Sequence, residues 1–422
     1  MKKLLALLLC ALLILPAVAF ADDVTEITLW TYPIGSWTDD AVVSEMLANF
    51  QAAYPNIRVK VQYLDYQSGD DQVTTAIEAH TTPDIVMEGP ERLVANWGAA
   101  GKMLDISDLW DDAVKADIIA ASPAVEAACK NAEGVYYEYP LCMTTHCMVI
   151  NYNDFEKADA LQYIDEATHT WTTDGFLKAL EALNNAGYQP TGVVYCGGQG
   201  GDQGTRALVT NLYSGQFTNA DHTAYTMDSE ANIKALTLLQ DLVKEGKLDA
   251  DPGIVAADEI ALFCNSTISI GFCWNASSAV SNKASLADDV KVFPMAFPSD
   301  DGVPELQGGI WGFGLFDNGD DAKVAAAKTF VKFVCDDPSQ AAASVYASGF
   351  FPTRASLGDV YAGTEKAENG EYAIFMPFLG DYYQVTPNWA AQRTEWWNLL
   401  QRIFAGGDVA AEVAVYCTNV NK

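Results

Sequence analysis

The chain has 422 residues, half of them hydrophobic, and a formal net charge of −32 at neutral pH. This length is sufficient for two domains of ordinary size, and the composition provides ample material for their cores. The strong negative charge disfavours nucleic acid and anionic lipid surfaces as partners, because both repel an acidic protein.

The first 21 residues have the pattern of an export signal. Lys2 and Lys3 precede an apolar run at residues 4–15, and residues 19–21 form a small-x-small cleavage pattern. The run is too short to cross a membrane as a helix, and no later stretch is apolar for long enough. Cys10 follows three leucines, which argues against a lipid anchor. We therefore expect a cleaved signal peptide and a mature protein in the periplasm or outside the cell, without a membrane span.

Strand and helix patterns alternate after the signal. Residues 27–30 predict a buried strand, residues 39–54 a helix with apolar residues at helical spacing, and residues 57–63 a half-buried strand. A further short strand is expected at residues 84–87. This alternation is typical of a mainly parallel sheet with helices on both faces.

The pattern changes at residues 136–151, which predict one long extended stretch, and then resumes. Thr173 can cap a helix that ends at Gly187, residues 268–272 alternate as a strand, and further helical patterns follow towards the end of the chain. Trp396 completes the apolar face of the last of these patterns, so we expect it in the core. No flexible linker is visible. We therefore expect two α/β lobes between which the chain crosses on ordered strands.

Motifs for catalysis and cofactor binding are missing from the sequence. The four histidines form no zinc-binding pair, and the glycine-rich residues 197–201 lack the spacing of a dinucleotide-binding loop. The strongest metal candidate is the group Cys142, His146 and Cys147, but on one strand Cys147 would point away from the other two. We therefore expect core packing here, no metal, no cofactor and no catalytic residue.

Eight cysteines follow the signal, an even number that invites a disulfide interpretation in an exported protein. Cys142 and Cys147 are unlikely to pair within one strand, since five residues span about 16 Å. Large domains do not need such crosslinks, and several of the cysteines lie at apolar positions. We expect most of them to be reduced and buried.

Aromatic residues at loop-like positions give the clearest indication of function. The chain has ten tryptophans and 19 tyrosines, and several of them end strands or lie between glycines. A flat ring can stack on the apolar face of a sugar while nearby carboxylates and amides bind its hydroxyl groups. In open α/β sheets ligands bind at the carboxyl ends of strands, where Trp30, Glu88 and Trp274 fall. The alternative for each of these tryptophans is a residue at the edge of a core.

Several short motifs, taken in order, resemble the extracellular solute-binding proteins of carbohydrate ABC importers, the maltose-binding type known as family 1. The resemblance spans nearly all of the sequence after the signal. It is carried by TPDIV at 82–86, GKMLD at 101–105, GVYYEYP at 134–140, NYNDF at 151–155, TWTTDGF at 170–176, GFCW at 271–274 and FPTR at 351–354.

The resemblance implies a two-lobed fold of the periplasmic-binding-protein type II, with a hinge between the lobes. The amino-terminal lobe would hold residues 22–142 and 311–345, and the carboxy-terminal lobe residues 143–310 and 346–422. It also implies a monomer that captures a sugar or oligosaccharide in the cleft and delivers it to the permease subunits of an ABC importer.

The family's acid–arginine pair falls on Glu91 and Arg92. Glu88 stands where the family has an aromatic residue just past its PD strand, and Thr144 stands where the family often has an acid in the hinge strand. Trp274 matches the tryptophan of the family's G-x-W motif. The candidate ligand-binding residues are Trp30, Tyr32, Trp37, Tyr66, Glu88, Glu91, Arg92, Thr144, Tyr195, Trp274, Asn275, Trp311, Arg354 and Trp389.

Two alternatives stay open. The same fold could bind a polyamine, a glycerol phosphoester or a metal complex, although only Arg92, Arg206 and Arg354 could supply charge for a phosphoester. The chain could also be an extracellular carbohydrate-active enzyme.

Overall fold

The computed structural model describes residues 24–66, 68–198 and 200–422. The expected signal peptide, residues 1–21, lies outside the described residues. None of the helices in these ranges combines the length and the apolar character needed to cross a membrane.

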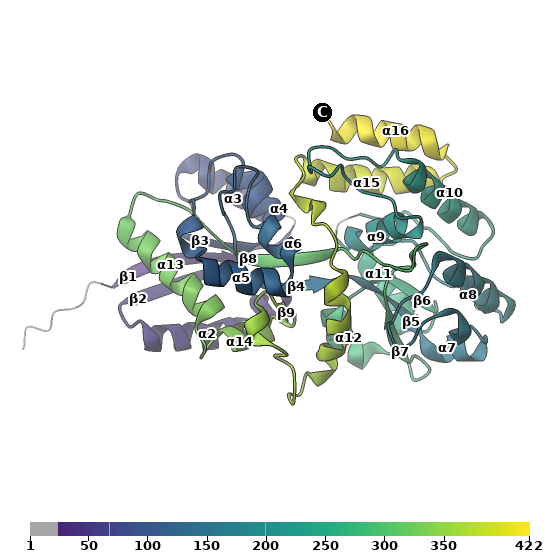
Figure 1. The fold of residues 1–422 in the computed structure, drawn as a ribbon, viewed down its shortest axis with the longest axis horizontal. Helices are drawn as coiled ribbons and strands as arrows, with labels where there is room; N and C mark the ends of the chain where they lie inside the picture. Colours follow the sequence, from purple (N-terminus) through teal and green to yellow (C-terminus); the bar gives the residue numbers. More distant parts are fainter. Residues whose placement is uncertain (1–23, 67, 199) are drawn as a thin grey trace, which may run out of the picture.

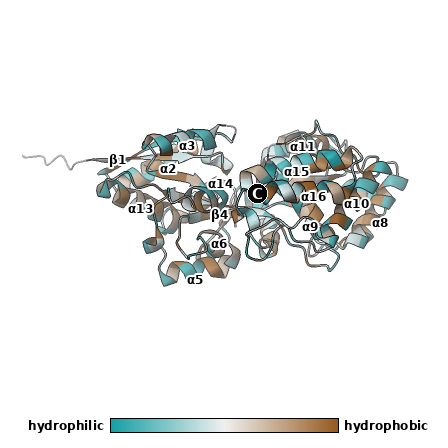
Figure 2. Ribbon diagram, turned by 90° about the horizontal axis from the view of Figure 1, so that it is seen from above, coloured by the Kyte–Doolittle hydropathy of each residue, from teal (hydrophilic) through white to brown (hydrophobic). Residues whose placement is uncertain are grey.

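Two β-sheets organise the chain into two lobes that lie side by side (Figure 1), joined at a waist near β4 (Figure 2). The large sheet has the strand order β2-β1-β3-β8-β4-β9, and the small sheet has the order β6-β5-β7. This arrangement confirms the two-lobed α/β fold. The strands are β1 Thr25–Thr31, β2 Ile57–Tyr63, β3 Ile85–Glu88, β4 Tyr139–Thr145, β5 Cys147–Asn151, β6 Ile270–Trp274, β7 Val292–Met295, β8 Gly308–Leu315 and β9 Phe351–Pro352.

Only part of the large sheet is parallel. β1 pairs in parallel with β2 and β3, as the alternation of strands and helices predicts. β8 then pairs antiparallel with both β3 and β4, and the small sheet is antiparallel throughout. The expectation of a mainly parallel sheet is therefore wrong. The local pattern does not reveal that β8 returns from the other lobe and inserts between β3 and β4.

The helices of the first lobe pack around the large sheet. Asp39 caps the first of them by accepting a hydrogen bond from the Ala41 N–H at 2.9 Å. The buried residues Val43, Met46 and Phe50 follow at helical spacing and face the core. The helical segments around this sheet are η1 Gly35–Thr38, α2 Asp40–Ala53, α3 Gly69–Ala79, α4 Pro90–Arg92, η2 Leu93–Gly98, η3 Ser107–Leu109, α5 Asp112–Ala121, α6 Pro123–Ala128, α13 Asp321–Asp336, α14 Ala341–Ser348 and η6 Ala355–Leu357.

The helices of the second lobe surround the small sheet. The cap of α8 is Thr172 rather than the expected Thr173, because Thr172 accepts the Gly175 N–H while Thr173 donates its hydroxyl to the Leu212 carbonyl. Trp396 is fully buried, as expected. The remaining helical segments are α7 Tyr152–Lys157, η4 Leu161–Tyr163, α8 Thr173–Asn185, α9 Asp202–Leu212, α10 Glu230–Lys244, α11 Ala256–Cys264, α12 Ala276–Asn282, η5 Lys283–Ser285, η7 Ala367–Phe378, η8 Tyr383–Val385, α15 Trp389–Phe404 and α16 Val409–Val420.

The described part of the chain passes between the two sheets three times. The expected single extended stretch at 136–151 is broken at His146, so β4 and β5 belong to different sheets. The chain returns between β7 and β8, and the His146 N–H donates to the Gln307 carbonyl of this second passage at 2.7 Å. The third passage follows β9. The expected lobe boundaries at 142, 310 and 345 stay a prediction; β4 continues to Thr145 and β8 begins at Gly308.

The eight cysteines of the described part of the chain are all buried and free. Because Cys142 lies on β4 and Cys147 on β5, the two side chains belong to different sheets. Burial raises the pKa of Cys142 and of Cys147. Both thiols therefore behave as small apolar residues in the core.

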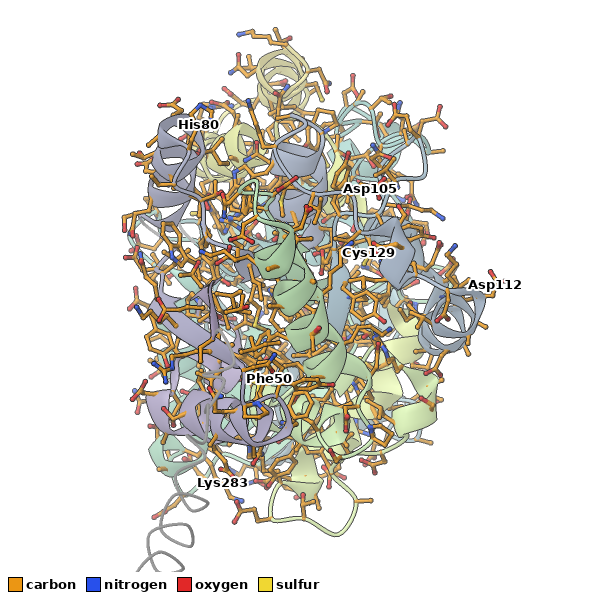
Figure 3. The ribbon with its side chains drawn as sticks, turned by 90° about the vertical axis from the view of Figure 1, so that its left-hand side faces the viewer. Phe50, His80, Asp105, Asp112, Cys129 and Lys283 are labelled. Carbon is orange, nitrogen blue, oxygen red and sulfur yellow. The ribbon has the colours of Figure 1, made fainter. Side chains whose placement is uncertain are left out.

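We expect Phe50→Ala to lower the free energy of unfolding by about 3–5 kcal/mol. The Phe50 ring lies 5.0 Å from the ring of Phe330 and 5.4 Å from that of Phe333, inside the first lobe (Figure 3). Removing it leaves a cavity between α2 and α13. Urea unfolding measures the change. Val415→Ala on α16, where the side chain is 47% exposed, should change the value by less than about 0.5 kcal/mol. Equal losses for the two variants would contradict the packing described.

Candidate functional site

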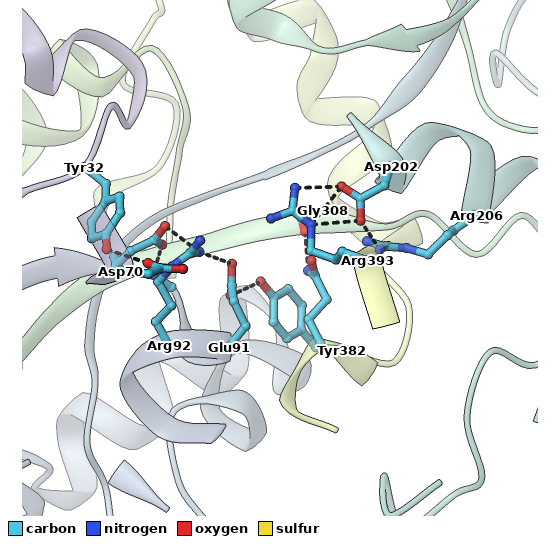
Figure 4. A network of polar contacts seen from close by, with 12 residues as sticks. Tyr32, Asp70, Glu91, Arg92, Asp202, Arg206, Gly308, Tyr382 and Arg393 are labelled. Atoms are coloured by element: carbon cyan, nitrogen blue, oxygen red, sulfur yellow. Dashed lines mark hydrogen bonds and ion pairs between the residues drawn. The ribbon is translucent and has the colours of Figure 1, made fainter. Parts of the chain in front are cut away.

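A network of polar side chains lies where the two lobes face each other (Figure 4). Tyr32, Asp70, Glu88, Glu91 and Arg92 come from the first lobe, from the ends of β1 and β3 and the starts of α3 and α4. The second group is formed by Asp202 and Arg206 of α9 and Arg393 of α15, and Tyr382 lies between the groups. We treat this network as the candidate site.

Arg92 is the centre of the first-lobe group. Its Nε lies 2.6 Å from Asp70 Oδ1, and its Nη1 lies 3.0 Å from Glu88 Oε1 and 3.7 Å from Glu91 Oε1. The sharp turn after β3 brings these side chains together. Gly89 is required there, since an added Cβ would lie 2.6 Å from Glu91 Oε2 and 2.8 Å from the Ile310 carbonyl. The arginine therefore holds three acids in fixed positions.

Two tyrosines form a flat surface beside this arginine. The Tyr32 hydroxyl donates to Asp70 Oδ1 at 2.6 Å, and the Tyr32 and Tyr66 rings stack with centroids 5.4 Å apart. The Arg92 guanidinium lies 5.1 Å from the Tyr32 ring centre and 5.5 Å from that of Tyr66. Tyr66 is 48% exposed, whereas Tyr32 is buried. The site therefore offers one open aromatic ring next to fixed hydrogen-bonding groups.

Two acids near Arg92 are buried. Burial raises the pKa of Glu88 to about 8; Arg92 opposes this shift and Glu91 adds to it. Glu138 precedes β4 and is fully buried, and neither of its carboxyl oxygens has a hydrogen-bond partner. Burial, with the charges of Glu91 and Glu88, raises the pKa of Glu138 well above its usual value. Glu88 and Glu138 therefore favour the protonated form at neutral pH. We call the first-lobe group, together with Tyr66 and Glu138, the first-lobe wall of the site.

The second-lobe group has the opposite balance of charge. Asp202 is fully buried and pairs with Arg206 and with Arg393, whose Nη2 lies 3.0 Å from Asp202 Oδ1. Burial alone would raise the pKa of Asp202, but Arg206 and Arg393 hold it at about 2. The Arg206 guanidinium lies 4.4 Å from the Trp389 ring centre, and its Nε donates to the Tyr383 hydroxyl at 3.0 Å. The group is therefore one carboxylate between two guanidinium ions.

Tyr382 and Gln384 lie on the third passage of the chain, and Tyr382 lies near both groups (Figure 4). The buried Tyr382 donates its hydroxyl to Glu91 Oε2 at 3.3 Å, and Gln384 donates to the Gly308 carbonyl at 2.8 Å. Arg393 is 28% exposed and near enough for its charge to act on the Tyr66 hydroxyl. The two walls are therefore close in this conformation.

Six of the sequence-predicted residues lie at or beside this network. Tyr32, Tyr66, Glu88, Glu91 and Arg92 belong to the first-lobe group. Trp389 reaches the second-lobe group only through its contact with Arg206. Their role in binding a ligand stays a prediction.

Four other predicted residues lie elsewhere in the first lobe. Trp37 is buried against Phe313, and Arg354 is buried, with its Nε 2.8 Å from Asp336 Oδ1. Trp311 is partly exposed but stacks on Phe350 with ring centres 4.7 Å apart, and Trp30 is a partly buried residue of β1. None of the four has a hydrogen bond, ion pair or ring contact with the described residues of the network in this conformation.

The remaining four lie in or near the second lobe and are already occupied by internal contacts. Trp274 is buried and donates Nε1 to the Tyr372 hydroxyl at 2.8 Å. Tyr195 is fully buried and donates to the Gly201 carbonyl, and Asn275 caps α12. Thr144 is buried in β4. The position of Trp274 at the end of a strand indicated an open ring, but Tyr372, 98 residues later, covers it.

Sequence reasoning missed Asp70, Asp202, Tyr382 and Arg393. Asp70 was indistinguishable from other acids of a very acidic chain. Asp202 and Arg206 are four residues apart, a spacing that pairs charges on one helix face, so this ion pair had a usable signal. Tyr382 reaches Glu91 across 291 residues of sequence, and Arg393 reaches Asp202 across 191. No local pattern could have indicated either contact.

Comparisons with known proteins agree with this architecture. A family model described as bacterial extracellular solute-binding protein matches residues 34–341. No match to this chain is found among curated proteins.

Solved structures with a similar fold include three described as follows. An ABC substrate-binding protein from Listeria monocytogenes in complex with cycloalternan is 19% identical, with a TM-score of 0.72, and 94% of this chain and 98% of that chain are covered. A putative oligosaccharide periplasmic-binding protein from a Synechococcus species is 16% identical, with a TM-score of 0.75 and 94% and 98% coverage. The sugar-binding protein MalE from Xanthomonas citri is 15% identical, with a TM-score of 0.74 and 94% and 96% coverage. At these identities the likeness establishes the fold.

We expect Asp202→Asn to lower the free energy of unfolding by about 3–5 kcal/mol, because Arg206 would remain buried without its charge partner. The pKa of Asp202 falls from 3.8 to about 2 on folding, so its stabilising effect is present above pH 4 and is lost towards pH 2. Urea unfolding from pH 2 to 7 measures this effect. The free energy of unfolding of the variant should lack the part of its fall between pH 4 and pH 2 that Asp202 causes in the wild type. Asp112→Asn, at the exposed first position of α5, is the control and should unfold as the wild type does.

Glu88 should make the protein less stable as pH rises. Its pKa increases from 4.5 to about 8 on folding, so its contribution is fully present below pH 4.5 and declines up to about pH 8. This decline is at most about 1.4 kcal/mol per pH unit from one group. Glu88→Gln should flatten the fall in unfolding free energy between pH 5 and 8, measured by urea titration. An unchanged slope in this variant would show that Glu88 ionises normally; the exposed Glu133→Gln is the control.

Proposed function

The chain belongs to the bacterial extracellular solute-binding proteins, and on that premise we propose that it captures a saccharide between its lobes for an ABC importer. The observation that carries the proposal is the half-exposed Tyr66 ring beside the fixed Arg92 network. The similar folds of proteins described as binding cycloalternan, oligosaccharides or sugar support the same ligand class.

A saccharide has both kinds of surface that this site can bind. Its apolar face stacks on the Tyr66 ring, which can cover roughly 150–250 Å² when buried. Its hydroxyl groups donate to Asp70 and accept from Arg92 and Arg393, and bonds to charged groups are stronger than neutral ones. Because these side chains already hold each other in place, little ordering is required when the ligand binds.

Capture follows from closure of the lobes about the three passages. In this proposal the lobe built around the large sheet moves as one body against the lobe built around the small sheet. A ligand that touches Tyr66 on one wall and Arg393 on the other interacts more strongly with the closed form. That difference in affinity is what drives closure.

The remaining parts of the proposal concern location and partners. The mature protein acts outside the cytoplasm as a monomer, without catalysis, and hands the saccharide unchanged to the permease subunits of the importer.

A ligand screen tests the proposal. Thermal melting and tryptophan fluorescence would be followed with mono- and oligosaccharides, polyamines and glycerol phosphates. A true ligand at 100 times its Kd stabilises the folded state by about 2.7 kcal/mol. We expect the largest shifts from saccharides. A shift with polyamines or glycerol phosphates alone, or turnover of a labelled glycan, would contradict the proposal.

We expect Tyr66→Ala to weaken saccharide binding at least about tenfold, or about 1.4 kcal/mol, because the open ring is lost. Isothermal titration calorimetry gives the affinity, and the melting point without ligand should change little. Tyr63→Ala is a matched control. Tyr63 is 38% exposed on β2 and bonds to Asp40, outside the candidate site. Unchanged affinity in Tyr66→Ala would remove this ring from the binding surface.

A further inference from the structure

Four acids converge on one arginine at the first-lobe wall. Asp70, Glu88 and Glu91 pair with Arg92, while Glu138 has no ion pair. The salt bridges among the described residues give these four acids no cation other than Arg92. Four carboxylates and one guanidinium would carry a formal charge of −3 when all are ionised, and the formal charge is still −1 when Glu88 and Glu138 hold their protons. This wall is therefore short of positive charge and of hydrogen-bond donors.

Strand register places Glu138 on the same side of the sheet as Glu88. Met87 of β3 and Tyr139 of β4 both pair with Phe313 of β8, so these three residues share one face. Glu88 and Glu138 are each one residue away along the chain and face the opposite side. Consistent with this, the charges acting on Glu138 are those of Glu91 and Glu88, and Glu138 acts in turn on Tyr382.

Glu138 provides an observation independent of the acid cluster itself. Its side chain is 0% exposed, and both carboxyl oxygens lack a donor. Buried polar groups in native structures almost always have a partner, because an unpaired one loses its hydration without compensation. An unpaired carboxyl group this close to Glu88 and Glu91 indicates that a donor-rich group completes this part of the site.

The opposite wall limits the charge that such a group can carry. Asp202 with Arg206 and Arg393 has a formal charge of +1, and Arg393 is the partly exposed member. A ligand with positive charge along its whole length would be repelled there. A ligand with one cationic group at the first-lobe wall and neutral acceptors at the second is complementary to both.

We propose that the bound saccharide carries a protonated amine, so that the ligand is an amino sugar whose ammonium group contacts Glu88, Glu91 and Glu138. This inference rests on the proposed function and names the ligand class of the same site. An ammonium group supplies three hydrogen-bond donors, whereas a hydroxyl supplies one. The Tyr66 ring adds a favourable surface for a cation. The single charge separates this ligand from a polyamine.

The assignment has a second consequence for protons. The raised pKa of Glu88, about 8, means that this acid holds its proton near neutral pH when the site is empty. An adjacent ammonium group favours the ionised carboxylate. Binding should therefore transfer a proton from the carboxyl group to the buffer, while the amine keeps its own. A neutral sugar should release none.

Sugars that differ at one carbon provide the test. Glucosamine, galactosamine and mannosamine would each be compared with the corresponding neutral hexose and with the N-acetyl derivative. The comparison would be repeated with α-1,4 and β-1,4 disaccharides that carry each of these sugars at the reducing end. Calorimetry in buffers of different ionisation enthalpy measures affinity and proton release together. We expect an amine to bind at least tenfold more tightly than its neutral counterparts and to release protons.

Two isosteric variants test which acid causes the preference for the amino sugar. Glu138→Gln should reduce the preference for the amine at least about fivefold. Glu259→Gln should keep the preference, since Glu259 is an equally buried acid that bonds to the Phe272 N–H inside the second lobe. Melting curves verify that both variants fold. An unchanged preference in Glu138→Gln would overturn the role of this residue.

The outcomes separate the two proposals. Equal or tighter binding of the neutral or N-acetylated sugars would overturn the amino-sugar inference and support the proposed function. Binding by none of the saccharides, with or without an amine, would contradict the proposed function itself.

Discussion

The buried guanidinium of Arg92 is the interaction on which the candidate site depends. Asp70, Glu88 and Glu91 come from three places in the chain, and without a cation between them their carboxylates would repel. Arg92 also lies against the Tyr32 and Tyr66 rings, so it fixes the aromatic surface and the acids at once. Arginine suits this position because its planar group binds several oxygens in fixed directions while stacking on rings.

The second wall uses the same chemistry with the charges reversed. There one carboxylate, Asp202, lies between Arg206 and Arg393, and the Trp389 ring covers the buried arginine. The buried Arg92, Asp202 and Arg206 thus each have a partner of opposite sign, as the cost of desolvating ions requires. Glu138 has no such partner, and its pKa is raised accordingly. Because the excess charge is negative on one wall and positive on the other, the two walls are complementary in charge.

Much of the fold could be predicted from the sequence, because the spacing of apolar residues that marks a strand or a helix lies within a short segment. Residues 27–87 alternate between strand and helix patterns, and β1, α2, β2 and β3 form as predicted. The antiparallel insertion of β8 was not accessible, since its neighbours β3 and β4 precede it by more than 160 residues. The break at His146 was also hidden, because the residues on either side have equally apolar, extended patterns.

The sequence predicted residues of the candidate site only where they lie at or just after the end of a strand. Glu88 is the last residue of β3, and Glu91 and Arg92 follow it in α4, at the end of the sheet where ligands bind in such folds. Trp37 and Trp274 also lie near strand ends, but packing against Phe313 and Phe263 buries both rings. Whether a ring beside a strand stays open depends on segments that arrive later in the chain, as Tyr372 does at Trp274.

The exposed and buried side chains of the candidate site indicate which groups a ligand would contact first. Tyr66 and Asp70 are about half exposed on one wall, and Arg393 is partly exposed on the other. Their partners Tyr32, Arg92, Asp202 and Arg206 are buried and hold these groups in place. A solute therefore first contacts side chains that are accessible yet already oriented. Glu88 and Glu138 are buried, so in the proposed capture the ligand meets the exposed groups before it meets these acids.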